Sequence, residues 1–204
     1  MINPCPSTQD QDENVPCPPG GRHVGAHHRP LLNFPGPRLK VVYVSVALRL
    51  RRFKPENLTA EPREIVESIP LRSSGRAFEE EIAQGILFDL GEEWNGPHAA
   101  LAGAQADPST PGFQPVLGGD FLGRTETEVV VVLRPEQVAF VSVFLNGLDI
   151  PGLVAANSRD IEGATGDVVD RELAGQIEEI LGELAHFYAG AAESGDAVLK
   201  IAYS

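Results

Sequence analysis

The sequence predicts an α/β fold in which apolar strands alternate with amphipathic helices. Three observations support this prediction. Apolar, β-branched runs begin near Leu39 and Glu128, prolines open helical patterns after each run, and a helical apolar stripe over 169–191 precedes a last apolar run at 197–203. The 204 residues suffice for one hydrophobic core, which buries about 70% of the surface that an unfolded chain of this size exposes.

Residues 1–38 combine many prolines and glycines with few large apolar residues, so we expect a disordered leader before a single domain over 39–204. Alternatively, the natural protein begins near the first strand, and residues 1–38 do not belong to it. The leader contains potential zinc ligands, which are Cys5, Cys17, His23, His27 and His28. Because eleven residues separate the cysteines and no C-x₂₋₄-C knuckle is present, we expect no metal site.

The formal net charge of −13 falls entirely on residues 39–204, because three acidic residues and three arginines cancel before residue 39. An acidic surface repels phosphate backbones, so nucleic acid is an unsuitable partner. The sequence contains no membrane-length apolar run and no secretory signal, which predicts a soluble cytoplasmic protein without a membrane partner. A basic protein partner would be attracted, although negative charge also serves solubility alone.

The first half of the domain reads as one strand followed by helices. The run from Leu39 to Leu50 predicts a strand covered on both faces. Pro55 and Pro62 suit the first turns of two short helices. Residues 77–90 place apolar side chains at helical spacing, which predicts another helix.

Pro97 predicts a kink or a new helix start at Gly96, because it lacks a backbone N–H. Residues 103–115 then read as a loop, and the pair Gly118 and Gly119 as a tight turn or a close backbone approach.

The second half repeats the order of strand and helix. Residues 128–134 predict a strong strand, and Pro135 opens a helix. A loose stretch rich in Gly and Asp follows. Asp167 is the expected cap of a long helix that Gly195 ends, and 197–203 form the last strand.

Several kinds of catalytic chemistry are missing from residues 39–204. They contain no cysteine and only two histidines, His98 and His186, which excludes a thiol nucleophile and a typical zinc site. No lysine follows a glycine loop, GGDFLG lacks the spacing of a dinucleotide fingerprint, and no G-x-S-x-G elbow is present. We therefore expect no cofactor.

One polar cluster deserves a functional interpretation: Asp89, Glu92, Glu93, Trp94 and His98 lie within ten residues. Carboxylates tune a nearby histidine for acid–base work, and Trp94 and His98 would share a helix face at i and i+4. The simpler interpretation is structural. It makes Trp94 a core anchor, the acids helix N-terminal residues and His98 a satisfied or exposed side chain.

Ordered weak motifs give this sequence a family resemblance. They include VVYVSVALRL, AEPREIVESI, Asp89-Leu90 with Trp94 and His98, Gly118-Gly119, LRPEQVAFVSVFLNGL and the helix ending in LAHFYAGAAESGDAVLKI. In this order they resemble the YfbM-like family of uncharacterised bacterial proteins. The resemblance implies a three-layer α/β sandwich with one mixed sheet, and it implies no activity.

The resemblance carries over a candidate pocket of Asp89, Trp94 and His98, with Gly118 and Gly119 in matching places. The family's lysine and first histidine are replaced by Glu92 and Asn95, so a polar site of the family is in doubt here.

Two functional hypotheses remain. The leading one is a non-enzymatic, acidic cytoplasmic binding protein for a basic protein partner, which rests on the charge and the missing catalytic groups. The alternative is a small-molecule site, hydrolytic or acid–base, around Asp89, Trp94 and His98. Neither the ligand nor the oligomeric state follows from the sequence.

Overall fold

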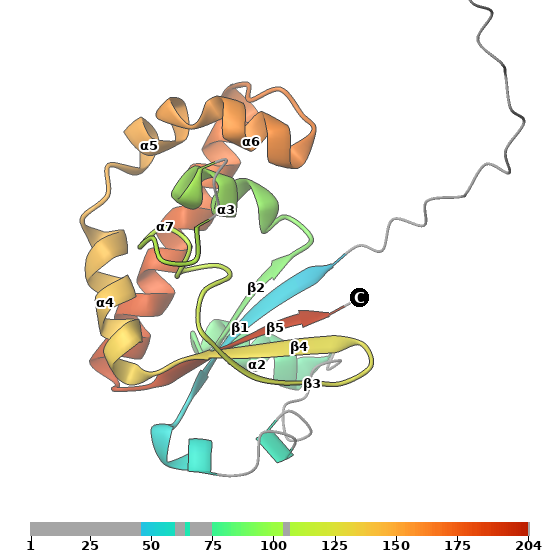
Figure 1. Cartoon of the computed structure of the whole chain (residues 1–204), viewed down its shortest axis with the longest axis vertical. Helices are drawn as coiled ribbons and strands as arrows, with labels where there is room; N and C mark the ends of the chain where they lie inside the picture. Colours follow the sequence, from blue (N-terminus) through green and yellow to red (C-terminus); the bar gives the residue numbers. More distant parts are fainter. Residues whose placement is uncertain (1–45, 60–63, 66–74, 104–106, 204) are drawn as a thin grey trace, which may run out of the picture. The chain divides into compact units, whose positions relative to one another are not determined.

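The computed structural model describes residues 46–59, 64–65, 75–103 and 107–203, which contain one five-stranded sheet (Figure 1). The strands are β1 (Ala47–Phe53), β2 (Leu87–Gly91), β3 (Asp120–Arg124), β4 (Glu128–Leu133) and β5 (Ala197–Tyr203). Their order is β2-β1-β5-β4-β3, which makes β2 and β3 the edges. The α/β class is confirmed, but the sheet expected to be mixed is antiparallel at each of its four pairings.

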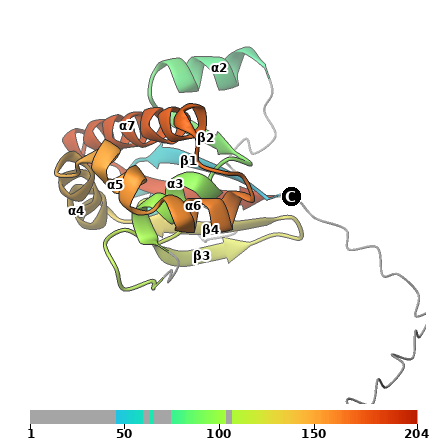
Figure 2. The ribbon, with the colours of Figure 1, turned by 90° about the horizontal axis from the view of Figure 1, so that it is seen from above.

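The helices are η1 (Pro55–Thr59), α2 (Arg76–Ala83), α3 (Asn95–Ala102), α4 (Pro135–Asn146), α5 (Ile150–Ala156), α6 (Ser158–Thr165) and α7 (Arg171–Glu193). Helices α3, α5, α6 and α7 lie on one side of the sheet and η1 on the opposite side (Figure 1). Helices α4 and α7 lie side by side in both ribbon views (Figures 1 and 2).

The central strand β5 divides the core into two parts, because its side chains alternate between the two faces of the sheet. Val198 belongs to the larger hydrophobic cluster, which the sheet forms with α3 to α7. Leu199 and Ile201 face the other way, into a smaller cluster with Ile65 and with Leu58 of η1.

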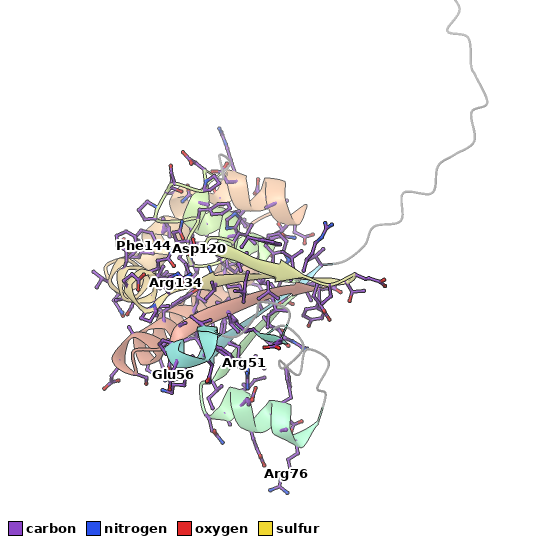
Figure 3. The ribbon with its side chains drawn as sticks, turned by 60° about the horizontal axis from the view of Figure 1, so that its bottom comes forward. Arg51, Glu56, Arg76, Asp120, Arg134 and Phe144 are labelled. Atoms are coloured by element: carbon purple, nitrogen blue, oxygen red, sulfur yellow. The ribbon has the colours of Figure 1, made fainter. Side chains whose placement is uncertain are left out.

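Helix α2 lies beside the edge strand β2 (Figure 2), and none of its described residues belongs to the smaller cluster. The guanidinium of Arg51 on β1 ties it to the sheet by pairing with Glu81 at 2.6 Å (Figure 3). The smaller cluster is covered by Leu58 of η1 and by Ile65, so helical residues lie on both faces of the sheet, as the expected three layers require.

The strongest sequence patterns were predicted correctly. Strands β4 and β5 and the start of α4 at Pro135 lie where expected. Helix α7 ends as predicted: Gly195 has φ +63°, and the Asp196 amide donates to the Ala191 carbonyl at 2.9 Å. Its N-cap is Asp170 instead of Asp167, because the Asp170 carboxylate accepts from two amides of the first turn.

The helix predicted over 77–90 is wrong after Ala83. Gly85 adopts φ +66°, and the Ile86 amide reaches back to the Glu81 carbonyl at 2.9 Å. This left-handed cap ends α2, and the following apolar residues form the edge strand β2.

The prediction of a loose stretch after α4 is also wrong. It forms α5 and α6, whose residues Val154 and Ile161 are fully buried against the larger cluster. Strand β3 was missed, since only a turn was expected near Gly118. Of the two outcomes predicted at Pro97, the new helix start is confirmed to within one residue. Helix α3 begins at Asn95, and Pro97 lies in its first turn, where the missing N–H is not needed.

Three predictions lie outside the described residues. These are the disordered leader and its potential zinc ligands, the strand over 39–45, and the helix start at Pro62.

Candidate functional site

Asp89 does not join the other residues of the predicted pocket. It lies on β2 opposite Arg49 of β1, and the two side chains pair at 3.2 Å between Oδ2 and Nε. Its neighbours Phe88 and Leu90 pack into the larger cluster, so Asp89 faces the other side of the sheet. His98 belongs to α3, which packs on the side of the larger cluster. The sheet therefore separates the two residues.

Trp94 and His98 do lie together, one helical turn apart, as their spacing predicts. Their ring centroids are 6.3 Å apart, and the ring of Phe113 meets His98 edge-on at 5.2 Å. The Trp94 indole N–H donates to the Val46 carbonyl at 2.8 Å, which ties α3 to the start of β1. His98 is thus enclosed by two aromatic rings.

Neither ring nitrogen of His98 has a hydrogen-bond partner among the described residues, although the residue is only 8% exposed. Burial lowers the pKa of His98, and the nearby Lys200 lowers this pKa further. The ring is therefore held neutral, with one donor and one acceptor. Leaving a buried polar group unsatisfied costs about 1–3 kcal/mol.

Lys200 is a buried lysine that the sequence analysis missed as a site residue. It lies on β5, is 1% exposed, and donates from Nζ to the carbonyls of Gly118 at 2.6 Å and of Gln114. Burial holds the pKa of Lys200 well below its usual value. The available signal was one lysine within the apolar run AVLKIAY, but nothing in the sequence places it near His98.

Gly118 and Gly119 are required by the backbone. A Cβ on Gly118 would lie 2.6 Å from Gln114 Cα, and a Cβ on Gly119 would lie 2.8 Å from the Val132 carbonyl oxygen. Gly119 also has φ +136°, which favours glycine. The close backbone approach predicted here is confirmed, and these contacts give the two glycines a structural role.

A cavity of about 260 Å³ lies where α3 and the end of α6 meet α7. Its polar lining consists of Glu92, Glu93, Asn95, Thr165, Asp167 and Gln176. Its apolar lining consists of Gly96, Pro97, Leu173, Ile177 and Ile180. We call this cavity the acidic pocket, because its described lining has three carboxylates and no cationic side chain.

Close helix packing builds the acidic pocket. A Cβ on Gly96 would lie 3.1 Å from Ile177 Cδ1, so the glycine brings α3 close to α7. Within the described residues, none of the three carboxylates forms an ion pair. Glu92 and Glu93 belonged to the cluster found in the sequence, whereas Asp167 was assigned only as a helix cap.

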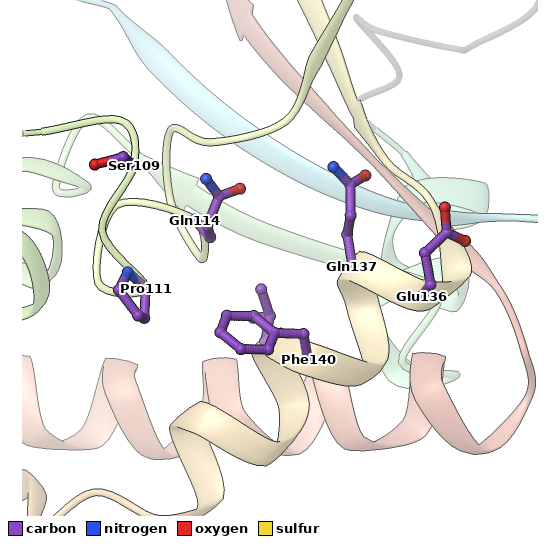
Figure 4. Close-up of a pocket in the computed structure, with 7 residues that line it drawn as sticks. Ser109, Pro111, Gln114, Glu136, Gln137 and Phe140 are labelled. Carbon is purple, nitrogen blue, oxygen red and sulfur yellow. The ribbon is translucent and has the colours of Figure 1, made fainter.

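A second cavity, of about 300 Å³, lies between the 109–114 segment and the first turns of α4 (Figure 4). Phe140 lines it and is 54% exposed. The Gln114 amide that lines it already donates to the Pro108 carbonyl, and Gln137 caps the helix by accepting from the Arg134 amide. The Arg134 guanidinium in turn pairs with Asp120 at 3.4 Å (Figure 3). This cavity thus offers few free polar groups.

The described part of the chain contains no group of three or more His, Cys, Asp or Glu side chains placed to hold a metal ion. No single helix in it has the length and apolar character to cross a membrane, although α4 and α5, bent by 83°, pass that test as a pair.

Comparisons with known proteins show the family and the fold. The chain is similar to the crystal structure of YfbM from Escherichia coli, a protein of unknown function, with a TM-score of 0.52 and 18% identity. The match covers 76% of this chain and 99% of that chain. No curated protein matches this sequence. Residues 44–201 match the family model described as a domain of unknown function, DUF1877, and the chain belongs to this family.

Proposed function

We propose that this domain is a non-enzymatic, acidic binding protein of the bacterial cytoplasm, and that it holds a basic side chain of a protein partner in the acidic pocket. The observation that carries the proposal is a cavity with three carboxylates, Glu92, Glu93 and Asp167, and no cationic side chain.

The two parts of the pocket lining match the two parts of a lysine or arginine side chain. Such side chains lay their alkyl stems on apolar surface while the charged head reaches polar groups. Leu173, Ile177 and Ile180 offer surface to the stem. The carboxylates and the Asn95 and Gln176 amides offer hydrogen-bond acceptors to the head.

The charge of the chain supports the same partner. The net charge of −13 steers a basic protein toward the domain and accelerates its association, an effect that salt weakens. A stable complex of this kind buries roughly 1,200–2,000 Å² of surface, so the pocket would receive one anchor within a wider interface.

The acids also have a structural explanation, because Glu92 and Glu93 precede α3 and Asp167 precedes α7. A carboxylate near a helix N-terminus contributes about 0.3–1 kcal/mol to stability. Stability and binding are separable, however, since stability is measured on the free protein.

The test is a pull-down in which the protein is the bait and an extract of the native host, at low salt, supplies the partner. A carbodiimide then links carboxylates of the bait to amines of the bound partner. The pocket variant carries Glu92→Gln, Glu93→Gln and Asp167→Asn. The control carries Glu126→Gln, Glu178→Gln and Glu179→Gln, which removes the same charge outside the pocket. We expect the wild type and the control to retain one basic protein cross-linked at the pocket, and the pocket variant to bind it at least about tenfold more weakly, or about 1.4 kcal/mol. Equal loss in both variants contradicts the pocket.

A small-molecule site at Trp94 and His98 is a second candidate, favoured by the two unpartnered nitrogens of His98. A ligand that binds only the folded state raises its stability by about 2.7 kcal/mol at a hundredfold excess over Kd. We would screen metabolites by thermal shift of the whole chain and of His98→Ala. A shift that disappears in His98→Ala supports this candidate, and a shift that persists argues against it.

A further inference from the structure

The edge strand β2 lies beside a cavity of about 760 Å³. Its floor is Leu87 and Phe88 of β2. One wall is the end of α2 with Ile82, and the other is α7 with Gly182 and Glu183. We call this cavity the β2 groove. None of its residues lines the acidic pocket.

Among the described residues, no strand pairs with the outer edge of β2, which lies next to the groove. Strand β2 pairs with β1 alone among the described strands and ends the sheet. The outer edge of such a strand presents backbone N–H and C=O groups that match an added strand. Of the five residues of β2, Leu87 and Phe88 line the groove, so an added strand would begin in the groove and continue along the rest of β2.

Small residues leave room along the α7 wall. A Cβ on Gly182 would meet no atom within 4 Å, so this position faces open space. Across the groove, Ile82 is an exposed apolar side chain, 42% accessible, beside the apolar floor. The groove therefore offers apolar contact to alternate side chains of an extended segment.

The charges of the groove favour a basic segment. Its cationic guanidinium, on Arg52, is already engaged by Asp196 at 2.9 Å and by Ser194 at 2.5 Å. Glu183 and Glu193 line the groove and form no ion pair with another described residue. Two carboxylates thus remain to pair with lysine or arginine of a ligand.

We propose that the β2 groove binds an extended peptide of alternating basic and apolar residues, which adds a strand to β2. Main-chain hydrogen bonds hold the peptide, apolar side chains contact Ile82 and the floor, and basic side chains reach Glu183 and Glu193. This site is separate from the acidic pocket, and its test does not depend on the function proposed above.

The probes are three acetylated, amidated hexapeptides in which lysine alternates with valine, leucine or phenylalanine. Binding to the whole chain is measured by calorimetry, and hydrogen exchange is followed at residues 87–91. The same peptides methylated at every backbone amide are the controls, because they keep charge and side chains but cannot donate main-chain hydrogen bonds.

Two glycines of α7 give a matched pair of variants. Gly182→Gln fills the groove, whereas Gly175→Gln adds the same side chain two helical turns away, outside it. Neither Cβ meets an atom within 4 Å, and glycine is a poor helix former, so neither variant should unfold the domain.

We expect at least one unmethylated peptide to bind the wild type and Gly175→Gln and to slow exchange over 87–91. The same peptide should bind Gly182→Gln at least tenfold more weakly. The methylated peptide should show no detectable binding to the wild type. The variant lacking the three carboxylates of the acidic pocket should still bind. Absence of binding to the wild type, equal binding of the methylated peptide, or unchanged affinity for Gly182→Gln overturns the proposal.

Discussion

The side-chain amine of Lys200 donates a hydrogen bond of 2.6 Å to the carbonyl oxygen of Gly118, which joins the central strand to the segment that leads into the edge strand β3. The same nitrogen also donates to the Gln114 carbonyl. Next to these contacts, the Tyr188 hydroxyl donates to the Pro115 carbonyl at 2.8 Å. Buried side chains of β5 and α7 therefore hold the 114–118 segment through its backbone.

Replacing Lys200 with methionine should destabilise the domain by about 1–3 kcal/mol, because two buried carbonyls lose their donor while the apolar volume is kept. Urea denaturation measures this change. Limited proteolysis should also cut near residues 109–119 faster than in the wild type. An unchanged urea midpoint would mean that these two hydrogen bonds only balance the cost of burying the amine.

The neutral state of His98 predicts a pH dependence of stability. Its pKa is lowered in the folded state, so between pH 6.5 and the folded pKa the unfolded chain binds more protons. The contribution of the neutral His98 ring to the free energy of unfolding is thus fully present above pH 6.5, and it is lost as the pH falls through the folded pKa. Stability of the wild type should fall more steeply from pH 7 to pH 5 than that of His98→Phe. Equal slopes in urea titrations would contradict a buried neutral histidine.

Asp196 is a buried carboxylate, with its side chain 5% exposed, and it binds two cations. Its oxygens lie 2.8 Å from Arg52 and 2.7 Å from Lys54. Removing one partner from a buried ion pair costs about 3–5 kcal/mol, and the exposure of Lys54 reduces this value, so we expect about 2–3 kcal/mol for Asp196→Asn.

The control for Asp196→Asn is Arg76→Ala, which breaks an exposed i, i+4 pair with Glu80. It should change the unfolding free energy by no more than about 0.5 kcal/mol. Both variants are compared by thermal and urea unfolding. Similar effects of the two would show that burial does not strengthen the Asp196 cluster.

Sequence patterns predicted the elements whose own residues specify them. Helix α7 carries a long apolar stripe with an acidic cap and Gly195 at its end, and β4 is a run of valines. The edge strands β2 and β3 have five residues each, too few for a clear period. Helices α5 and α6 have only seven and eight residues, too few to be stable alone, and burial of Val154 and Ile161 in the tertiary structure stabilises them.

The same distinction applies to the candidate site. The proximity of Trp94 and His98 is local and follows from helical spacing. The separation of Asp89 from His98 follows from the strand that replaced the predicted helix. The contact of Lys200 with Gly118 joins residues 82 positions apart, and no local pattern encodes it.

The backbone at Gly119 should tolerate no side chain. Its φ of +136° strains any L-residue, and an added Cβ would lie 2.8 Å from the Val132 carbonyl oxygen. We expect Gly119→Ala to lower the unfolding free energy by about 2 kcal/mol or more. Gly175→Ala, in the open on α7, should raise it by about 0.5–1 kcal/mol, because alanine favours the helix. Opposite signs in urea denaturation are therefore the expected result, and a neutral Gly119→Ala would mean that the turn before β3 can shift away from β4.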